Sequence, residues 1–97
     1  MTDLRKAAKG RECMIRIPDV CCGDPATTVL CHFRMAGISG MGLKSSDVLG
    51  AWGCFQCHSA VDRRAHMDLD FDFVRLCHLE GMVRTQAKLI EEGALKW

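Results

Sequence analysis

The sequence predicts a small α+β protein of one domain, with a β-hairpin in its first half and a long helix near its C-terminal end. Its 97 residues suffice for one domain, which we expect to span 1–97. Hydrophobic residues make up 48% of the chain and charged residues 26%, a balance typical of folded rather than disordered proteins. Apolar and polar residues alternate near Ile15, as in a strand, whereas apolar residues beyond position 69 recur with a helical spacing.

The β-hairpin is predicted over residues 13–34, after a basic N-terminal arm at 1–12. Its first strand surrounds Ile15, and its second strand runs over 27–33, where Thr and Val favour extended backbone. A Gly-Asp-Pro sequence at 23–25 supplies the turn between them.

The rest of the chain is predicted to form a loop and two helices. Residues 36–53 contain five of the nine glycines, which predicts a long Gly-rich loop. A first helix is expected over 58–66, and the longest over 69–92, with aspartates near its start and Gly93 beyond its end. The helical period places four residues on its inward face: Val74, Cys77, Met82 and Leu89.

The chain contains seven cysteines, which is many for its length. Its first residues are polar and charged with no apolar segment behind them, so we expect no secretory signal, a cytoplasmic location and reduced thiols. No apolar run reaches the roughly 18 residues that a membrane span requires, so we expect no membrane association. Small domains in a reducing compartment are commonly stabilised by a metal ion.

A structural Zn²⁺ site is the interpretation that the cysteine spacing favours. Cys54 and Cys57 are separated by two residues, which lets two thiolates reach one tetrahedral ion. Cys13 and either Cys21 or Cys22 are the candidates for the second pair. The alternative is a set of buried free thiols, a common state of cysteine in proteins.

Two other motifs in the chain are weaker. Residues 54–58 read Cys-Phe-Gln-Cys-His, which matches the covalent haem-attachment motif, but that chemistry requires an exported chain and leaves Cys13 and Cys21 unused. Residues 37–45 resemble a phosphate-binding loop, but Leu43 interrupts the required Gly-Lys succession.

A second candidate metal site lies just after the cysteine pair. His58 and Asp62 are four residues apart at the predicted helix start, so their side chains share a face and could hold a divalent ion. Arg63 and Arg64 follow directly and are suited to clamp a phosphate. The plain alternative is an ordinary exposed pair of charges.

Charge is distributed unevenly along the chain. Residues 1–66 carry nine Lys and Arg and six Asp and Glu, a balance of +3, whereas 67–97 carry four and six, a balance of −2. A basic first part that meets phosphate groups is consistent with this pattern, although the net charge of +1 does not itself require nucleic acid.

Taken together, the motifs resemble the YbcO-type family of prophage nucleases, in which a β-hairpin and a helix surround a metal in the HNH arrangement. The resemblance covers nearly the whole chain and rests on six motifs: Asp3-Leu4-Arg5-Lys6-Ala7-Ala8, Gly10-Arg11-Glu12-Cys13, Arg16-Ile17-Pro18, Cys54-x-x-Cys57-His58, Asp62-Arg63-Arg64 and Glu80-Gly81-Met82. It implies a zinc-stabilised HNH-like domain (ββα-metal, treble-clef-like) with a DNA-cleaving site.

The resemblance also implies roles for individual residues. His32 would be the general base, and His58 with Asp62 would hold Mg²⁺ or another divalent ion. Asp47 would orient His32, the task of the middle Asn in the family. Seven basic residues would grip the DNA backbone: Arg5, Lys6, Arg11, Arg34, Lys44, Arg63 and Arg64. A homodimer is a further expectation.

The alternative function is a non-catalytic zinc module that binds DNA or a protein partner in phage recombination. It is suggested by three departures from the family pattern, one of which is that Cys22 adds a fifth candidate ligand at the structural zinc site. Cys31 stands where many HNH sites have an acidic metal ligand, and Asp47 lies some residues from the expected place of the middle Asn.

Overall fold

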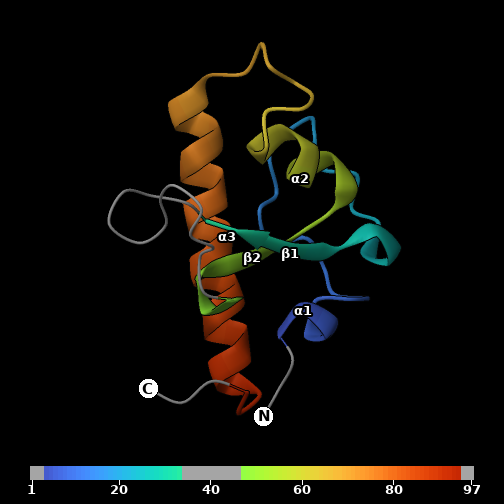
Figure 1. Cartoon of the computed structure of the whole chain (residues 1–97), viewed down its shortest axis with the longest axis vertical. Coiled ribbons are helices and arrows are strands. Elements are labelled where there is room, and N and C mark those ends of the chain that lie inside the picture. The colour runs from blue at the N-terminus through green and yellow to red at the C-terminus, as the bar shows by residue number, and fades with distance from the viewer. Residues whose placement is uncertain (1–3, 34–46, 95–97) are drawn as a thin grey trace.

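The computed structural model describes residues 4–33 and 47–94, and it confirms a small α+β fold with a two-stranded hairpin and a long C-terminal helix. Short 3-10 turns precede each strand, at Pro25–Thr27 and Asp47–Leu49. Figure 1 shows five main elements: α1 (Leu4–Ala7), β1 (Val29–His32), β2 (Gly50–Gly53), α2 (Phe55–Val61) and α3 (Phe71–Glu91).

The strand pairing differs from the predicted hairpin over 13–34. β1 pairs antiparallel with β2, in a register that places Leu30 opposite Trp52. The expected first strand is irregular, because Arg16 and Asp19 have φ angles of 53° and 61°, in the left-handed region that ends an extended run. The alternation near Ile15 therefore marks a turning segment with buried apolar residues and not a strand.

The end of the predicted loop over 36–53 is the strand β2, whose four residues are all buried. Glycine disfavours strands in general, but here it permits close contact between segments. A Cβ atom added to Gly53 would lie 2.6 Å from Ile15 Cδ1 and 2.8 Å from Cys31 Sγ. The strand therefore depends on tertiary contacts, while residues 36–46 of the predicted loop lie outside the described residues.

The helix α2 begins earlier and ends earlier than the predicted span of 58–66. Cys54 caps it, because its sulfur accepts a hydrogen bond from the Cys57 amide at 3.5 Å. The helix ends at Val61, and the chain then turns through left-handed φ angles at Arg63 and His66. The cysteine pair thus belongs to the helix start and does not precede it.

The long helix α3 agrees with the prediction over 69–92. The Asp70 carboxylate caps it by accepting a hydrogen bond from the Phe73 amide at 3.0 Å. Gly93, with φ of 79°, follows its end, and its amide donates to the Ile90 carbonyl. Of the residues predicted to face inward, three are buried and one is partly buried: Val74, Cys77 and Leu89, and Met82.

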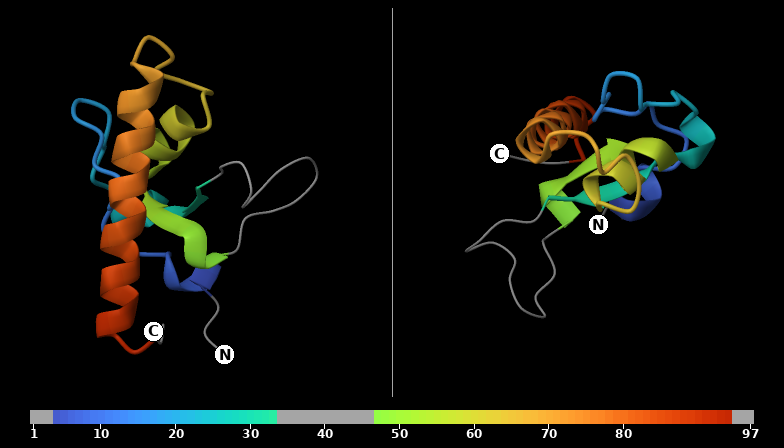
Figure 2. Two further views of the ribbon diagram at one scale, coloured as in Figure 1. Left: turned by 90° about the vertical axis from the view of Figure 1, so that its left-hand side faces the viewer. Right: turned by 90° about the horizontal axis from the view of Figure 1, so that it is seen from above.

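The core lies between α3, the hairpin and the irregular segment 13–21. α3 packs mainly on β2, and Figure 2 shows it on one side of the hairpin. Gly81 of α3 lies directly against Ile15, where an added Cβ would be 2.8 Å from the Ile15 Cα. In the part of the chain that the structure describes, no helix has both the length and the apolar character to cross a membrane.

Candidate metal centre and active-site cavity

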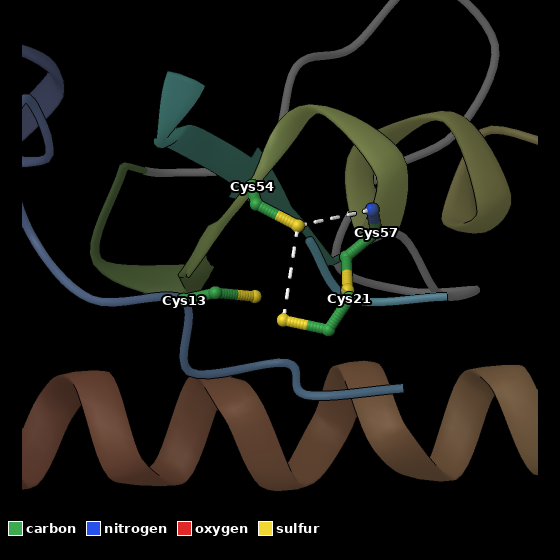
Figure 3. A group of neighbouring side chains, drawn as sticks. All are labelled: Cys13, Cys21, Cys54 and Cys57. Atoms are coloured by element: carbon green, nitrogen blue, oxygen red, sulfur yellow. Dashed lines mark hydrogen bonds between the residues drawn. The ribbon is translucent and has the colours of Figure 1, made fainter. Parts of the chain in front are cut away.

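Four cysteine sulfurs converge on one point in the core, those of Cys13, Cys21, Cys54 and Cys57. They all lie within 4.8 Å of one another, and the Cys21 and Cys54 sulfurs are 3.9 Å apart (Figure 3). Sulfurs around a tetrahedral zinc, at bond lengths of about 2.3 Å, are about 3.8 Å apart. The four side chains therefore could hold a metal ion.

The two halves of this cysteine cluster come from different local structures. Cys54 directly follows β2 and caps α2, and Cys57 lies in the first turn of α2. Cys13 and Cys21 lie at the two ends of the irregular segment, which the left-handed turns at Arg16 and Asp19 fold back on itself. The same folding selects Cys21, because the neighbouring Cys22 is exposed to solvent.

Electrostatics within the cluster favour a cation. A hydrogen bond from the Cys57 thiol lowers the pKa of Cys13 to about 4, and that contact, with burial, raises the pKa of Cys57. Burial raises the pKa of Cys21 to about 11. Without a cation only part of the cluster can ionise, whereas a bound divalent ion would give every thiolate an opposite charge.

Cys54 and Cys57 are both fully buried, and their sulfurs point toward the other two cysteines (Figure 3). This arrangement leaves neither sulfur exposed for a thioether bond to haem. Cys77, predicted to lie on the inward face of the long helix, is buried and lies outside the cluster.

A second centre of polar side chains begins at the end of β1, where His32 contacts Asp47. The His32 Nε2 atom is 2.6 Å from the Asp47 Oδ1 atom, although 15 residues separate them in sequence. This hydrogen bond from His32, with a further contact from Arg5 at 3.3 Å, holds the pKa of the Asp47 carboxyl below its usual value. The pairing predicted for these two residues is present in the structure.

His32 and Asp62 line the same cavity, which has a volume of about 270 Å³. His58 contacts Asp62, with 3.1 Å between Nε2 and Oδ2, so His58 lies next to a residue that lines the cavity. Arg63 and Arg64 also line it. The tertiary fold therefore brings the predicted base, the predicted metal-binding carboxylate and both predicted phosphate clamps to one place.

His58 and Asp62 supply two ligands to a metal at most. Among the described residues, the cysteine cluster is the one group of three or more histidine, cysteine or acidic side chains whose ligand atoms converge. A divalent ion at His58 and Asp62 would need further oxygen atoms from water or from a bound phosphate, as Mg²⁺ commonly does.

The cavity also contains residues that the sequence did not single out: Phe33, Phe71, Arg75 and His78. His78 is buried and shares a hydrogen bond with the Cys31 carbonyl at 2.9 Å, and burial lowers its pKa. The helical period that places Val74 on the inward face of α3 also places His78 there. The helical period does not predict that His78 lies near β1, because 46 residues separate it from His32.

Cys31, beside the predicted base, faces the opposite side of the strand. It is buried against the Gly53 backbone, and burial raises the pKa of its thiol. Among the described residues, the group of cysteines that could hold a metal does not include Cys31, and Cys31 does not line the cavity. The replacement of an acidic residue by Cys31 therefore does not bring a thiolate into the cavity.

The predicted DNA-binding residues outside the cavity have different surroundings. Arg5 contacts Asp47, and Lys6 is exposed on α1. Arg11 pairs with Glu92 at 2.7 Å and stacks on the Trp52 ring, so it joins the N-terminal segment to the end of α3. Two of the predicted residues lie outside the described part of the chain, Arg34 and Lys44.

Comparisons with known proteins show where the chain belongs. A model of the family described as "Putative nuclease YbcO" matches residues 2–94. The chain is 49% identical over 96 residues to "Putative nuclease YbcO" of Escherichia coli (strain K12), and equally to "Putative nuclease ybcO" of Enterobacteria phage 82, with 99% of each chain covered. A solved structure described as that of "a putative bacteriophage protein" from Escherichia coli K-12 superimposes with a TM-score of 0.80 at 44% identity, covering 94% of this chain and all of the other. The chain belongs to the YbcO family.

Proposed function

We propose that this protein is a metal-dependent DNA endonuclease of the HNH type, and that it derives from a prophage. The names of its relatives support nuclease activity, and one of them comes from a phage. The observation that carries the proposal is the His32–Asp47 pair at a cavity lined by Asp62 and three arginines. This combination offers a base, a metal-binding carboxylate and phosphate-binding cations within one site.

The order of the elements supports the HNH assignment. β1 ends at His32, β2 follows, and α2 begins two residues after β2 and carries His58. Two strands followed by a helix, with a histidine at the end of the first strand and another on the helix, correspond to the ββα-metal arrangement that the sequence motifs imply.

The chemistry assigned to His32 follows from its hydrogen bond. When Nε2–H donates to the Asp47 carboxylate, the lone pair on Nδ1 is left to accept a proton. His32 then removes a proton from water, and the resulting hydroxide attacks the phosphorus of the phosphodiester. Asp47 fixes the tautomer and the direction of the ring, and acts as a positioning residue.

The phosphate would be held by the cations around the cavity. Arg64 is largely exposed, and Arg63 is fixed by hydrogen bonds to the carbonyls of Met67 and Leu69. Guanidinium groups bind phosphate oxygens through paired hydrogen bonds, which orients the phosphorus toward His32. These contacts go to the backbone of the nucleic acid and do not read its sequence.

His58 and Asp62 would hold Mg²⁺ or another divalent ion, which would stabilise the charge on the phosphate and on the leaving oxygen. An imidazole and a carboxylate suit such an ion, and the two side chains already lie side by side, with 3.1 Å between Nε2 and Oδ2. In the cysteine cluster, Zn²⁺ would have a structural role. It would anchor Cys54 and Cys57 and thereby the first turn of α2, which carries His58.

The test is cleavage of single-stranded, duplex and branched DNA by the purified protein, with added Mg²⁺, Mn²⁺ or Zn²⁺ and with total metal measured. We expect cleavage by the wild type and its loss in His32→Ala. The matched control is His66→Ala, since His66 shares its hydrogen bond with Gln56 and does not line the cavity. Both variants should retain about one tightly bound zinc per chain.

Two results would contradict the nuclease proposal. Equal cleavage by the wild type and His32→Ala would remove His32 as the base. No cleavage by either protein, with zinc bound and with DNA binding weakened by Arg63→Ala or Arg64→Ala, would favour the non-catalytic zinc module instead.

A further inference from the structure

One exposed aromatic side chain of the cavity, Phe71, has no part in the proposed chemistry. Phe71, the first residue of α3, lines the cavity and is 53% exposed. The Arg63 guanidinium lies 5.6 Å from the centre of its ring, and the Arg75 guanidinium lies 5.8 Å from it. An exposed aromatic ring thus lies near two cations, beside the predicted catalytic residues.

The surroundings fix this arrangement in place. Arg75 also stacks on the buried ring of Phe33, 4.9 Å from its centre, and Phe33 packs edge to face against His78. Arg63 is held by carbonyl groups of the loop before α3. Phe71 therefore presents its ring to solvent from a layer of alternating aromatic and guanidinium groups, and little ordering is needed before a ligand binds.

The neighbouring Phe73 shows that exposure alone does not explain Phe71. Phe73 is 41% exposed on the same turn of α3, but it does not line the cavity. Scattered exposed apolar residues are ordinary on protein surfaces. Phe71 differs because it combines an accessible ring, two adjacent cations and a position at the cavity that holds His32.

The side chains that line the cavity around Phe71 have the chemistry needed to bind a nucleotide. Three arginines against one carboxylate, Asp62, favour an anion such as a phosphate, and a flat aromatic ring favours stacking with a base. The cavity, at about 270 Å³, is comparable with a site for one small molecule and not for two paired strands. A base within a duplex has both faces covered by its neighbours, so only an unpaired or extruded base can stack on Phe71.

We propose that Phe71 stacks on an unpaired base of the DNA next to the phosphate to be cleaved, which Arg63 contacts, while Arg75 contacts an adjoining phosphate. The proposal rests on the proposed nuclease function and adds its substrate class: DNA with unpaired nucleotides at the cleavage point, as at bulges, branches or single-stranded segments.

The experiment compares three DNA duplexes that differ at one point: fully paired, with one bulged base, and with one bulged abasic nucleotide. Binding is measured by fluorescence anisotropy with zinc-loaded protein and no other added metal, so that binding is separated from cleavage. The wild type should bind the bulged base roughly 5- to 150-fold more tightly than the abasic bulge, the range expected for stacking of one base. Phe71→Ala should bind the two equally, and Phe71→Trp should restore the preference.

Phe73→Ala is the matched control, because it removes an exposed ring from the same helical turn. It should keep the preference of the wild type, and all variants are checked for zinc content and helicity. The proposal is overturned if Phe71→Ala still prefers the bulged base, or if Phe73→Ala loses the preference equally. A preference that depends on Phe71 without any cleavage would support the stacking site and contradict the nuclease function, whereas cleavage without the preference would do the reverse.

Discussion

Replacement of Gly81 by alanine should destabilise the protein, although alanine is the better helix former. Gly81 lies in the middle of α3, where it faces the segment that carries Cys13. An added Cβ would lie 2.8 Å from the Ile15 Cα and 3.0 Å from the Ile15 nitrogen. Carbon atoms in good contact are about 3.5–4.0 Å apart, so α3 and the segment must separate by about 0.7 Å or more.

The change in the free energy of unfolding caused by Gly81→Ala is the sum of two opposing effects. Alanine in place of glycine in a helix gains about 1 kcal/mol from propensity. Overpacking of a core costs about 1–3 kcal/mol, and the cost is near the upper end when the neighbour is backbone that cannot rotate away. The Ile15 backbone has little freedom, because Arg84 of α3 donates to the Met14 carbonyl at 2.7 Å and the Met14 amide donates to the Trp52 carbonyl. We therefore expect a net loss of about 1–2 kcal/mol in the free energy of unfolding, or roughly 4–16 °C in Tm.

Thermal and urea unfolding of the zinc-loaded protein, followed by circular dichroism, measure this loss. Val83→Ala is the control, because Val83 is exposed on the same helix and its replacement changes propensity without a core contact. Since Ile15 is two residues from Cys13, Gly81→Ala should also release zinc faster to a chelator. A Gly81→Ala protein as stable as the wild type would refute the close packing of α3 on this segment.

Three further predictions concern the metal and the site. Cys54→Ser should lose zinc and most of its folded structure, because a structural zinc site contributes about as much free energy as the total stability of a small domain, whereas Cys77→Ser should retain its zinc. Metal analysis and circular dichroism compare the two variants, and equal zinc content in both would contradict the cysteine cluster as the zinc site. Asp47→Ala should lower the cleavage rate about 10- to 100-fold, because His32 is no longer held by its hydrogen bond. Asp47→Asn keeps an oxygen that accepts this hydrogen bond, so its cleavage rate should fall less. Equal cleavage rates in the two variants would show that Asp47 does not orient the base. Burial lowers the pKa of His78, so burial of its neutral form contributes stability that is complete above about pH 6.5 and is lost as the pH falls below that value, by at most about 1.4 kcal/mol per pH unit. The difference in the free energy of unfolding between the wild type and His78→Gln should therefore narrow as the pH falls below about 6.5, and a constant difference would contradict the lowered pKa.

The parts of the fold that the sequence predicted well depend on local signals. α3 could be located from the capping Asp70 and the terminal Gly93, because both act within one helical turn. The pair Cys54 and Cys57 could be recognised as a metal-binding motif because two intervening residues are enough to bring the sulfurs together. The pairing of His32 with Asp47 was expected from the family pattern and is present in the structure.

The parts that the sequence predicts wrongly or leaves open depend on contacts between distant segments. The glycines of residues 50–53 predict a loop, yet these residues form β2. Only a glycine at position 53 leaves room for the side chains of Ile15 and Cys31, which lie far from it in sequence. The choice of Cys21 over Cys22 depends on the left-handed turn at Arg16, which no residue preference at that position indicates.

Short-range spacing in the sequence is therefore enough to predict the α+β class, the long helix, the metal-binding pair Cys54 and Cys57 and the motifs of the YbcO family. The tertiary structure alone decided which strand pairs with β1 and which side chains surround His32. Phe71 and Arg75 join His32 in one cavity only because α3 packs across the hairpin, and that packing depends on the small residues Gly53 and Gly81, which allow the backbones to approach. Such close approach is a property of pairs of segments, and neither segment specifies it alone.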